Sequence, residues 1–207
     1  MHFYYYMHIQ IRASKEQQTT LLQKNINPDL KISWFTNELV NADAYVDLID
    51  DNHSTFSTIL SHPVIKNSII KTCENLPNNY CRINAWDSFL EKEKIEATTL
   101  SKSLNPIFIE ILNNLGFEVL LVSDIIGLVS PRTISMIINE AYFGLEDGIS
   151  TKKEIDTAMK LGTNYPFGPF EWAEKIGLQN IAKLLVALSK TDSRYTPSLL
   201  LLQEAKI

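Results

Sequence analysis

The chain has 207 residues and a formal net charge of -5, with 45% hydrophobic and 21% charged residues. These proportions are typical of a folded globular protein and unlike those of disordered or fibrous chains. The negative balance, without any run of Lys or Arg, argues against a nucleic-acid partner. No apolar run approaches the roughly 18–20 residues that a membrane span needs. Cys73 and Cys81 lack metal-ligand spacing and give no disulfide framework, so we expect a cytoplasmic protein without a metal.

Residues 1–124 alternate short β-rich runs with helical patterns, which is typical of a mostly parallel α/β sheet. The candidate strands are dense in β-branched and aromatic residues. They are residues 3–11, 31–35, 44–49, 80–85, 95–98 and 118–122. Ser14 can cap a helix after the first strand. Asn105 and Pro106 can open a later helix, which Gly116 would end in a left-handed conformation.

From residue 125 onward the pattern changes to a succession of capped helices with a period of 3.6, and no further strand is expected. Ser130 and Pro131 predict the start of a long helix that ends near Gly148. We therefore divide the chain into an α/β domain, residues 1–124, and an all-α domain, residues 125–207.

Four further helices are expected in the second domain, one of which follows Gly177 and carries Leu178, Ile181, Leu184, Leu185 and Leu188. Thr151 predicts a capping box for the first of the four, with Asp156 paired to Lys160 one turn later and Gly162 at its end. Prolines at the first turn predict two more helix starts. These prolines are Pro169 and Pro197.

Residues 155–178 read IDTAMKLGTNYPFGPFEWAEKIGL, and the preceding residues 138–154 read INEAYFGLEDGISTKKE. Both stretches resemble the C-terminal domain of the 3-hydroxyacyl-CoA dehydrogenase family, with glycines and prolines in register. The resemblance implies a reduced Rossmann-like sheet followed by the all-α domain. It also implies NAD-linked oxidation of a 3-hydroxyacyl-CoA or similar hydroxy acid, a role in fatty acid metabolism, and a homodimer formed through the helical domain.

In this family the first strand runs into a glycine-rich loop, which lets the cofactor pyrophosphate approach a helix N-terminus. All seven glycines of this sequence lie at or beyond Gly116, and residues 12–15 read Arg-Ala-Ser-Lys. The Cβ atoms of that segment would crowd a pyrophosphate. We therefore predict a degenerate NAD site. Asp50 and Asp51 could face a ribose at the end of a strand, although loop solubility explains them more simply.

Residues 79–96, NYCRINAWDSFLEKEKIE, resemble the family's strand with the catalytic histidine and the following strand with its glutamate partner. On that register the histidine position falls on or next to Asp87, and Glu96 takes the glutamate position after a small deletion. Pro131 takes the place of a substrate-site asparagine, and the neighbouring Ser130 could partly replace it. The candidate catalytic residues are therefore Asp87, Glu96 and Ser130.

Two main hypotheses remain open. The first is an NAD-linked 3-hydroxyacyl-CoA dehydrogenase. The second is a non-catalytic homologue that dimerises and binds an acyl- or CoA-like ligand, which the chemistry of the candidate residues favours because an ordinary carboxylate is a weak base at neutral pH. In a variant of the second hypothesis, the helical domain serves only to hold a homodimer together.

Overall fold

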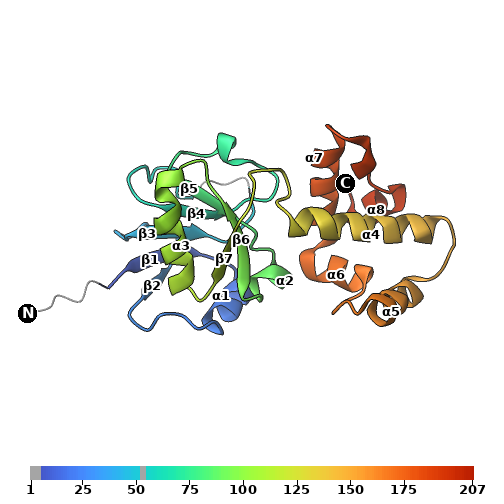
Figure 1. Ribbon diagram of the computed structural model, residues 1–207, viewed down its shortest axis with the longest axis horizontal. Helices are drawn as coiled ribbons and strands as arrows, with labels where there is room; N and C mark the ends of the chain where they lie inside the picture. The colour runs from blue at the N-terminus through green and yellow to red at the C-terminus, as the bar shows by residue number, and fades with distance from the viewer. Residues whose placement is uncertain (1–5, 52–54) are drawn as a thin grey trace, which may run out of the picture. The chain divides into compact units, whose positions relative to one another are not determined.

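The computed structural model describes residues 6–51 and 55–207 (Figure 1). The chain divides into two compact units, Met1–Ile125 and Ile126–Ile207. Residues 3–5 of the first candidate strand lie outside the described residues. No helix in the described part of the chain is long and apolar enough to cross a membrane.

Within the described residues, the first unit contains one seven-stranded sheet, in the order β2-β1-β3-β4-β5-β6-β7. Neighbouring strands pair in parallel except for β5 with β6. The strands are β1 (His8–Arg12), β2 (Lys31–Trp34), β3 (Ala44–Asp47), β4 (Val64–Asn67), β5 (Tyr80–Ile83), β6 (Lys94–Thr98) and β7 (Glu118–Leu121). This sheet, followed by a helical unit, confirms the predicted fold class.

The strand β4 was not predicted from the sequence. Only Val64 and Ile65 carry the usual strand signal, because Lys66 and Asn67 are polar. All four residues are nevertheless buried, as are all residues of the neighbouring β3 and β5. Such burial is expected for central parallel strands that are covered on both faces.

Short helices connect the strands of the first unit (Figure 1). They are α1 (Lys15–Leu22), η1 (Cys73–Asn75), α2 (Asp87–Leu90), η2 (Lys102–Leu104) and α3 (Asn105–Asn114). The predicted cap of α1 is confirmed, because Ser14 and Gln17 form a capping box. Gly116 follows α3 with φ +85, and a Cβ there would lie 3.1 Å from the backbone of Asn25. That close approach and the positive φ both require glycine.

The second unit consists of helices in its described residues, in agreement with the prediction. They are α4 (Ser130–Glu146), α5 (Lys152–Thr163), α6 (Pro169–Ile176), α7 (Leu178–Ser189), η3 (Ser193–Tyr195) and α8 (Leu199–Ala205). The long helix α4 packs against α6, α7 and α8. Thr151 forms the predicted capping box with Glu154, and Pro169 lies in the first turn of α6.

Three details of the second unit differ from the prediction. Helix α5 passes through Gly162 and ends at Thr163, because Asn164 adopts the left-handed conformation with φ 56. Lys160 forms its ion pair with Glu171 of α6 instead of with Asp156. The last helix begins at Leu199, after an N-cap at Ser198, and not at Pro197.

Candidate functional site

The strand order of the first unit reverses beside β1. The chain passes from β1 outward to β2 and then returns to β3 on the other side of β1. In open parallel sheets, ligands bind outside the carboxyl ends of the strands at such a switch point. Here the carboxyl ends are Arg12 in β1 and Asp47 in β3.

These two residues belong to a network of ion pairs. One guanidinium nitrogen of Arg12 lies 3.3 Å from each carboxylate oxygen of Asp47 and 3.1 Å from Oδ1 of Asp51. The other lies 2.6 Å from Oδ2 of Asp51. Lys66 of β4 donates from Nζ to Oδ2 of Asp47 at 3.1 Å. The second residue of the Asp50 and Asp51 pair is thus engaged by Arg12.

Burial sets the electrostatics of this network. The side chain of Asp47 is 2% exposed and that of Lys66 8% exposed, whereas Arg12 and Asp51 retain 21% and 31%. Burial raises the pKa of Asp47, although the charges of Lys66 and Arg12 oppose that shift. The hydrogen bond to Asp51 raises the pKa of Arg12, against an opposing effect of burial. Each cation of the network therefore has a carboxylate partner.

The N-terminus of α1 follows directly after β1. Ser14 Oγ accepts a hydrogen bond from the N–H of Gln17 at 3.1 Å, and Gln17 Oε1 accepts one from the N–H of Ser14 at 3.1 Å. Gln17 Nε2 also donates to the carbonyl oxygen of Leu48 at 3.0 Å. Glu16 adds a negative charge to the first turn. Two of the backbone donors that could hold an anion are therefore already satisfied.

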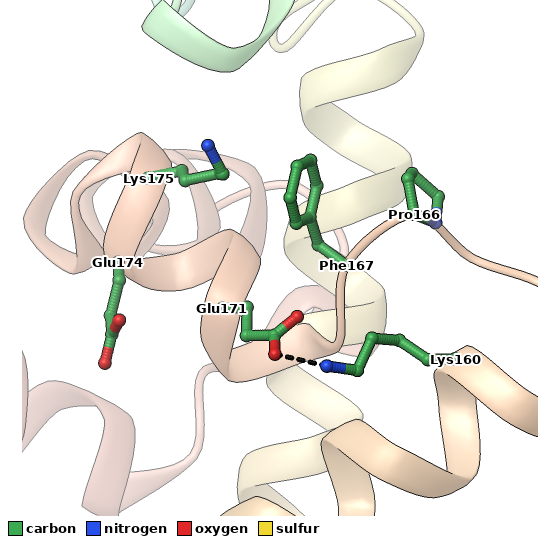
Figure 2. A pocket seen from close by; sticks show the side chains of 6 residues that line it. All are labelled: Lys160, Pro166, Phe167, Glu171, Glu174 and Lys175. Atoms are coloured by element: carbon green, nitrogen blue, oxygen red, sulfur yellow. Dashed lines mark hydrogen bonds and ion pairs between the residues drawn. The ribbon is translucent and has the colours of Figure 1, made fainter.

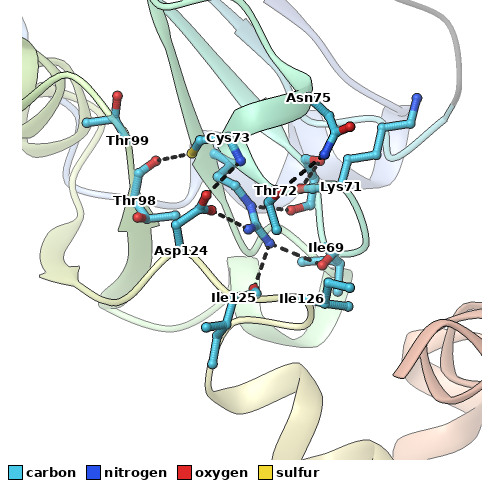
Figure 3. Close-up of polar contacts among 12 residues, drawn as sticks. Ile69, Lys71, Thr72, Cys73, Asn75, Thr98, Thr99, Asp124, Ile125 and Ile126 are labelled. Atoms are coloured by element: carbon cyan, nitrogen blue, oxygen red, sulfur yellow. Dashed lines mark hydrogen bonds and ion pairs between the residues drawn. The ribbon is translucent and has the colours of Figure 1, made fainter. Parts of the chain in front are cut away.

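A second polar cluster surrounds Arg82 of β5, whose side chain is completely buried. Arg82 donates to Oδ1 of Asp124 at 2.6 Å and also to the backbone carbonyls of Ser68, Ile69 and Ile125. The other oxygen of Asp124 accepts from the N–H of Cys73 at 2.9 Å (Figure 3). A buried guanidinium with a partner at each of its three nitrogens ties the end of the first unit to the sheet. The signal that could have indicated it is an Arg within the apolar strand.

The second unit has an open pocket of about 600 Å³ (Figure 2). It is lined by Lys160, Pro166, Phe167, Glu171, Glu174 and Lys175. The ion pair of Lys160 with Glu171 lies at one side. Lys175 Nζ lies 4.5 Å from the centre of the Phe167 ring. Its two lysines and two glutamates leave the pocket without a net charge, so it offers no special attraction to a phosphate.

Comparison with known proteins relates this architecture to enzymes. Residues 127–206 match the model of the 3-hydroxyacyl-CoA dehydrogenase C-terminal domain. The second unit therefore carries the C-terminal domain of the 3-hydroxyacyl-CoA dehydrogenase family. It is 44% identical over 96 residues to the 3-hydroxyadipyl-CoA dehydrogenase of Escherichia coli, a match that covers 45% of this chain and 20% of that protein.

Two proteins named as 3-hydroxybutyryl-CoA dehydrogenases match nearly the whole chain at lower identity. A probable 3-hydroxybutyryl-CoA dehydrogenase of Bacillus subtilis is 25% identical over 224 residues, which cover 94% of this chain and 75% of that protein. The crystal structure of (S)-3-hydroxybutyryl-CoA dehydrogenase from Ralstonia eutropha superposes with a TM-score of 0.75 at 17% identity. That alignment covers 96% of this chain and 93% of the other, and it shows that the fold is shared.

The family's histidine position corresponds to Asp87 in the predicted register. Asp87 is exposed in the first turn of α2 and is hydrogen-bonded to the side chain of Gln17. Partial burial of its carboxyl group raises the pKa of Asp87, and the negative charges of Glu16 and Glu91 raise it further. The hydrogen bond with Gln17 opposes this shift. The carboxylate of Asp87 therefore interacts with residues of α1, namely Gln17 and Glu16.

The other two candidate residues lie in different parts of the chain. Glu96 is 8% exposed in β6, and its carbonyl oxygen accepts a hydrogen bond from the N–H of Asn84 at 3.2 Å. Asn84 of the loop after β5, rather than Asp87, is thus its backbone partner. Ser130 is the first residue of α4 and belongs to the second unit, with Pro131 buried beside it. The catalytic roles of Asp87, Glu96 and Ser130 stay predictions.

Proposed function

We propose that this chain is a non-catalytic homologue within the 3-hydroxyacyl-CoA dehydrogenase family. In this proposal it forms a homodimer through its helical domain and binds an acyl- or CoA-like ligand in the cytoplasm, within fatty acid metabolism. The observation that carries the proposal is the exposed carboxylate of Asp87, which the predicted register places on or next to the family's histidine position.

General-base chemistry explains why this position decides the proposal. In the family a histidine takes the hydroxyl proton as the hydride leaves for NAD. An unperturbed carboxylate has a pKa of about 4 and is a weak base at neutral pH, although partial burial raises the pKa of Asp87 from that value. Loss of a general base costs on the order of 100- to 10,000-fold in rate. Pro131, at the asparagine position, has no side-chain donor for a substrate carbonyl, which supports the same conclusion.

The alternative function is the family's NAD-linked oxidation of a 3-hydroxyacyl-CoA, which the match of residues 127–206 favours. An absorbance assay at the NADH band, with 3-hydroxybutyryl-CoA and NAD, separates the two functions. We expect no turnover above the rate without protein. Turnover that Glu96→Gln abolishes, while the control Glu91→Gln at an exposed position retains it, would establish the dehydrogenase instead.

The proposed ligand can be tested on the same protein. A 3-hydroxybutyryl-CoA or acetyl-CoA titration followed by calorimetry should give saturable binding without any product. Free CoA and a simple hydroxy acid, each titrated alone, then tell which part of the molecule is recognised. Absence of heat with all of these probes would leave the dimer scaffold as the function.

A further inference from the structure

At the switch point of the sheet, the charged residues at the carboxyl ends of the strands pair with one another. Arg12 at the carboxyl end of β1 binds Asp47 at the end of β3 and Asp51 four residues later. Lys66 of the next strand donates to Oδ2 of Asp47. Three neighbouring strands, β1, β3 and β4, are thus tied together at the edge where sheets of this order usually bind a ligand.

We propose that Arg12, Asp47 and Asp51 form an internal clasp that occupies the place of a dinucleotide pyrophosphate, so that this chain binds neither NAD nor NADH in the usual mode. The inference rests on the proposed function, because a non-catalytic homologue has no need of the cofactor.

The charged residues at the switch point do not suit a bound pyrophosphate. The two cations there, Arg12 and Lys66, are already paired with carboxylates. An incoming pyrophosphate would have to take Arg12 away from Asp47, which is 2% exposed and would lose a partner without gaining water. It would also meet the negative charges of Asp47 and Asp51 at short range, where repulsion is strong.

The backbone between β1 and α1 does not suit a bound pyrophosphate either. A dinucleotide needs a glycine turn and free N–H groups at the helix that follows the first strand. Here Ser14 and Gln17 bond to each other's backbone N–H groups, and Glu16 places a carboxylate in the same turn. The residues between β1 and α1 all carry a Cβ, so the backbone is shielded where a phosphate would approach.

Cofactor binding tests one half of the proposal. The full chain is titrated with NADH up to about 1 mM, the upper end of ordinary enzyme KM values, and energy transfer from tryptophan to the nicotinamide is followed. We expect no saturable signal. Saturable binding would overturn the clasp, whether or not turnover occurs. Turnover in the dehydrogenase assay would overturn the proposed function, so the two failures can be told apart.

A double-mutant cycle tests the other half. Arg12→Ala should lower the melting temperature by roughly 4–8 °C, and Asp51→Ala by roughly 2–4 °C, in a chain of this size. The double variant should lose less than the sum, because both changes remove the same pair. Lys15→Ala, which removes an exposed charge from the adjacent helix, should change the melting temperature little. Additive effects of Arg12→Ala and Asp51→Ala would overturn the clasp.

Discussion

Asp156 on α5 and Gly168, the N-cap of α6, lie so close together that a Cβ on the glycine would sit 2.3 Å from Oδ1 of Asp156. The same oxygen accepts a hydrogen bond from the N–H of Phe170 at 2.8 Å. Asp156 therefore satisfies a free donor in the first turn of α6 from a neighbouring helix. Glycine is required here because there is no room for a side chain. Its backbone conformation, with a φ of -73, is one that any residue can adopt.

This contact predicts a large difference between two glycine substitutions. Gly168→Ala should lower the free energy of unfolding by about 1–3 kcal/mol or more, because the new methyl group must displace the buried Asp156. Gly162→Ala is the matched control, since a Cβ there meets nothing within 4 Å. Alanine in the exposed helix should raise stability by about 0.5–1 kcal/mol. Urea unfolding followed by circular dichroism measures both, and equal effects would contradict this account of the packing.

Arg82 gives the second prediction, because its side chain is 0% exposed and bound to Asp124. Arg82→Met should cost about 3–5 kcal/mol, since the substitution leaves a mostly buried carboxylate without its partner. The control Arg194→Ala removes a guanidinium that is 66% exposed beside Asp192 and should cost less than about 1 kcal/mol. Thermal unfolding compares the two. A double variant of Arg82→Met with Asp124→Leu should recover part of the loss, and failure to recover any would contradict the pairing.

The third prediction concerns the acid side of the stability profile. Burial opposes the shift, but hydrogen bonds from Lys152 and Tyr142 hold the pKa of Glu204 below its usual value. A carboxylate with a lowered pKa in the folded state contributes stability above its unfolded pKa of about 4.3, and the contribution disappears as the pH falls through the folded pKa. The difference in unfolding free energy between the native chain and Glu204→Gln should therefore be constant above about pH 5 and shrink below about pH 4.

Glu140→Gln, at an exposed position of α4, provides the comparison for that measurement. Its difference from the native chain should vary much less over the same pH range. If the difference for Glu204→Gln instead grew on acidification, the assignment of Glu204 as a paired carboxylate in the folded state would be wrong.

The proposed homodimer gives the fourth prediction. Leu161 on α5 is 83% exposed in the single chain, which is unusual for a leucine, and a second copy of the helical domain would cover it. Leu161→Glu should shift the protein from dimer to monomer in light scattering coupled to size-exclusion chromatography, because a buried unpaired charge disfavours association. Lys183→Glu at an exposed position of α7 should leave the dimer intact. A native chain that is monomeric at all concentrations would remove this part of the proposal.

Local features of the fold were predictable because each depends on a few adjacent residues. Ser14 and Thr151 form their capping boxes with partners three residues away, and Pro169 starts a helix as its fixed φ requires. The registered glycines and prolines of residues 155–178 were enough to indicate the family. The predicted helix end at Gly162 was wrong, because Asn164 and not Gly162 takes the left-handed conformation that ends α5.

Long-range pairing was decided by the tertiary structure. Arg12 and Asp51 are 39 residues apart, and Arg82 and Asp124 are 42 apart, so nothing in either neighbourhood specifies the partner. The strand β4 escaped detection because the burial of Lys66 becomes favourable only beside Asp47. The sequence by itself determined the helix starts at Ser14, Thr151 and Pro169, the fold class and the absence of a glycine-rich loop. The tertiary structure alone decided that Arg12 pairs with Asp47 and Asp51, because an ion pair exists only after folding brings distant charges together.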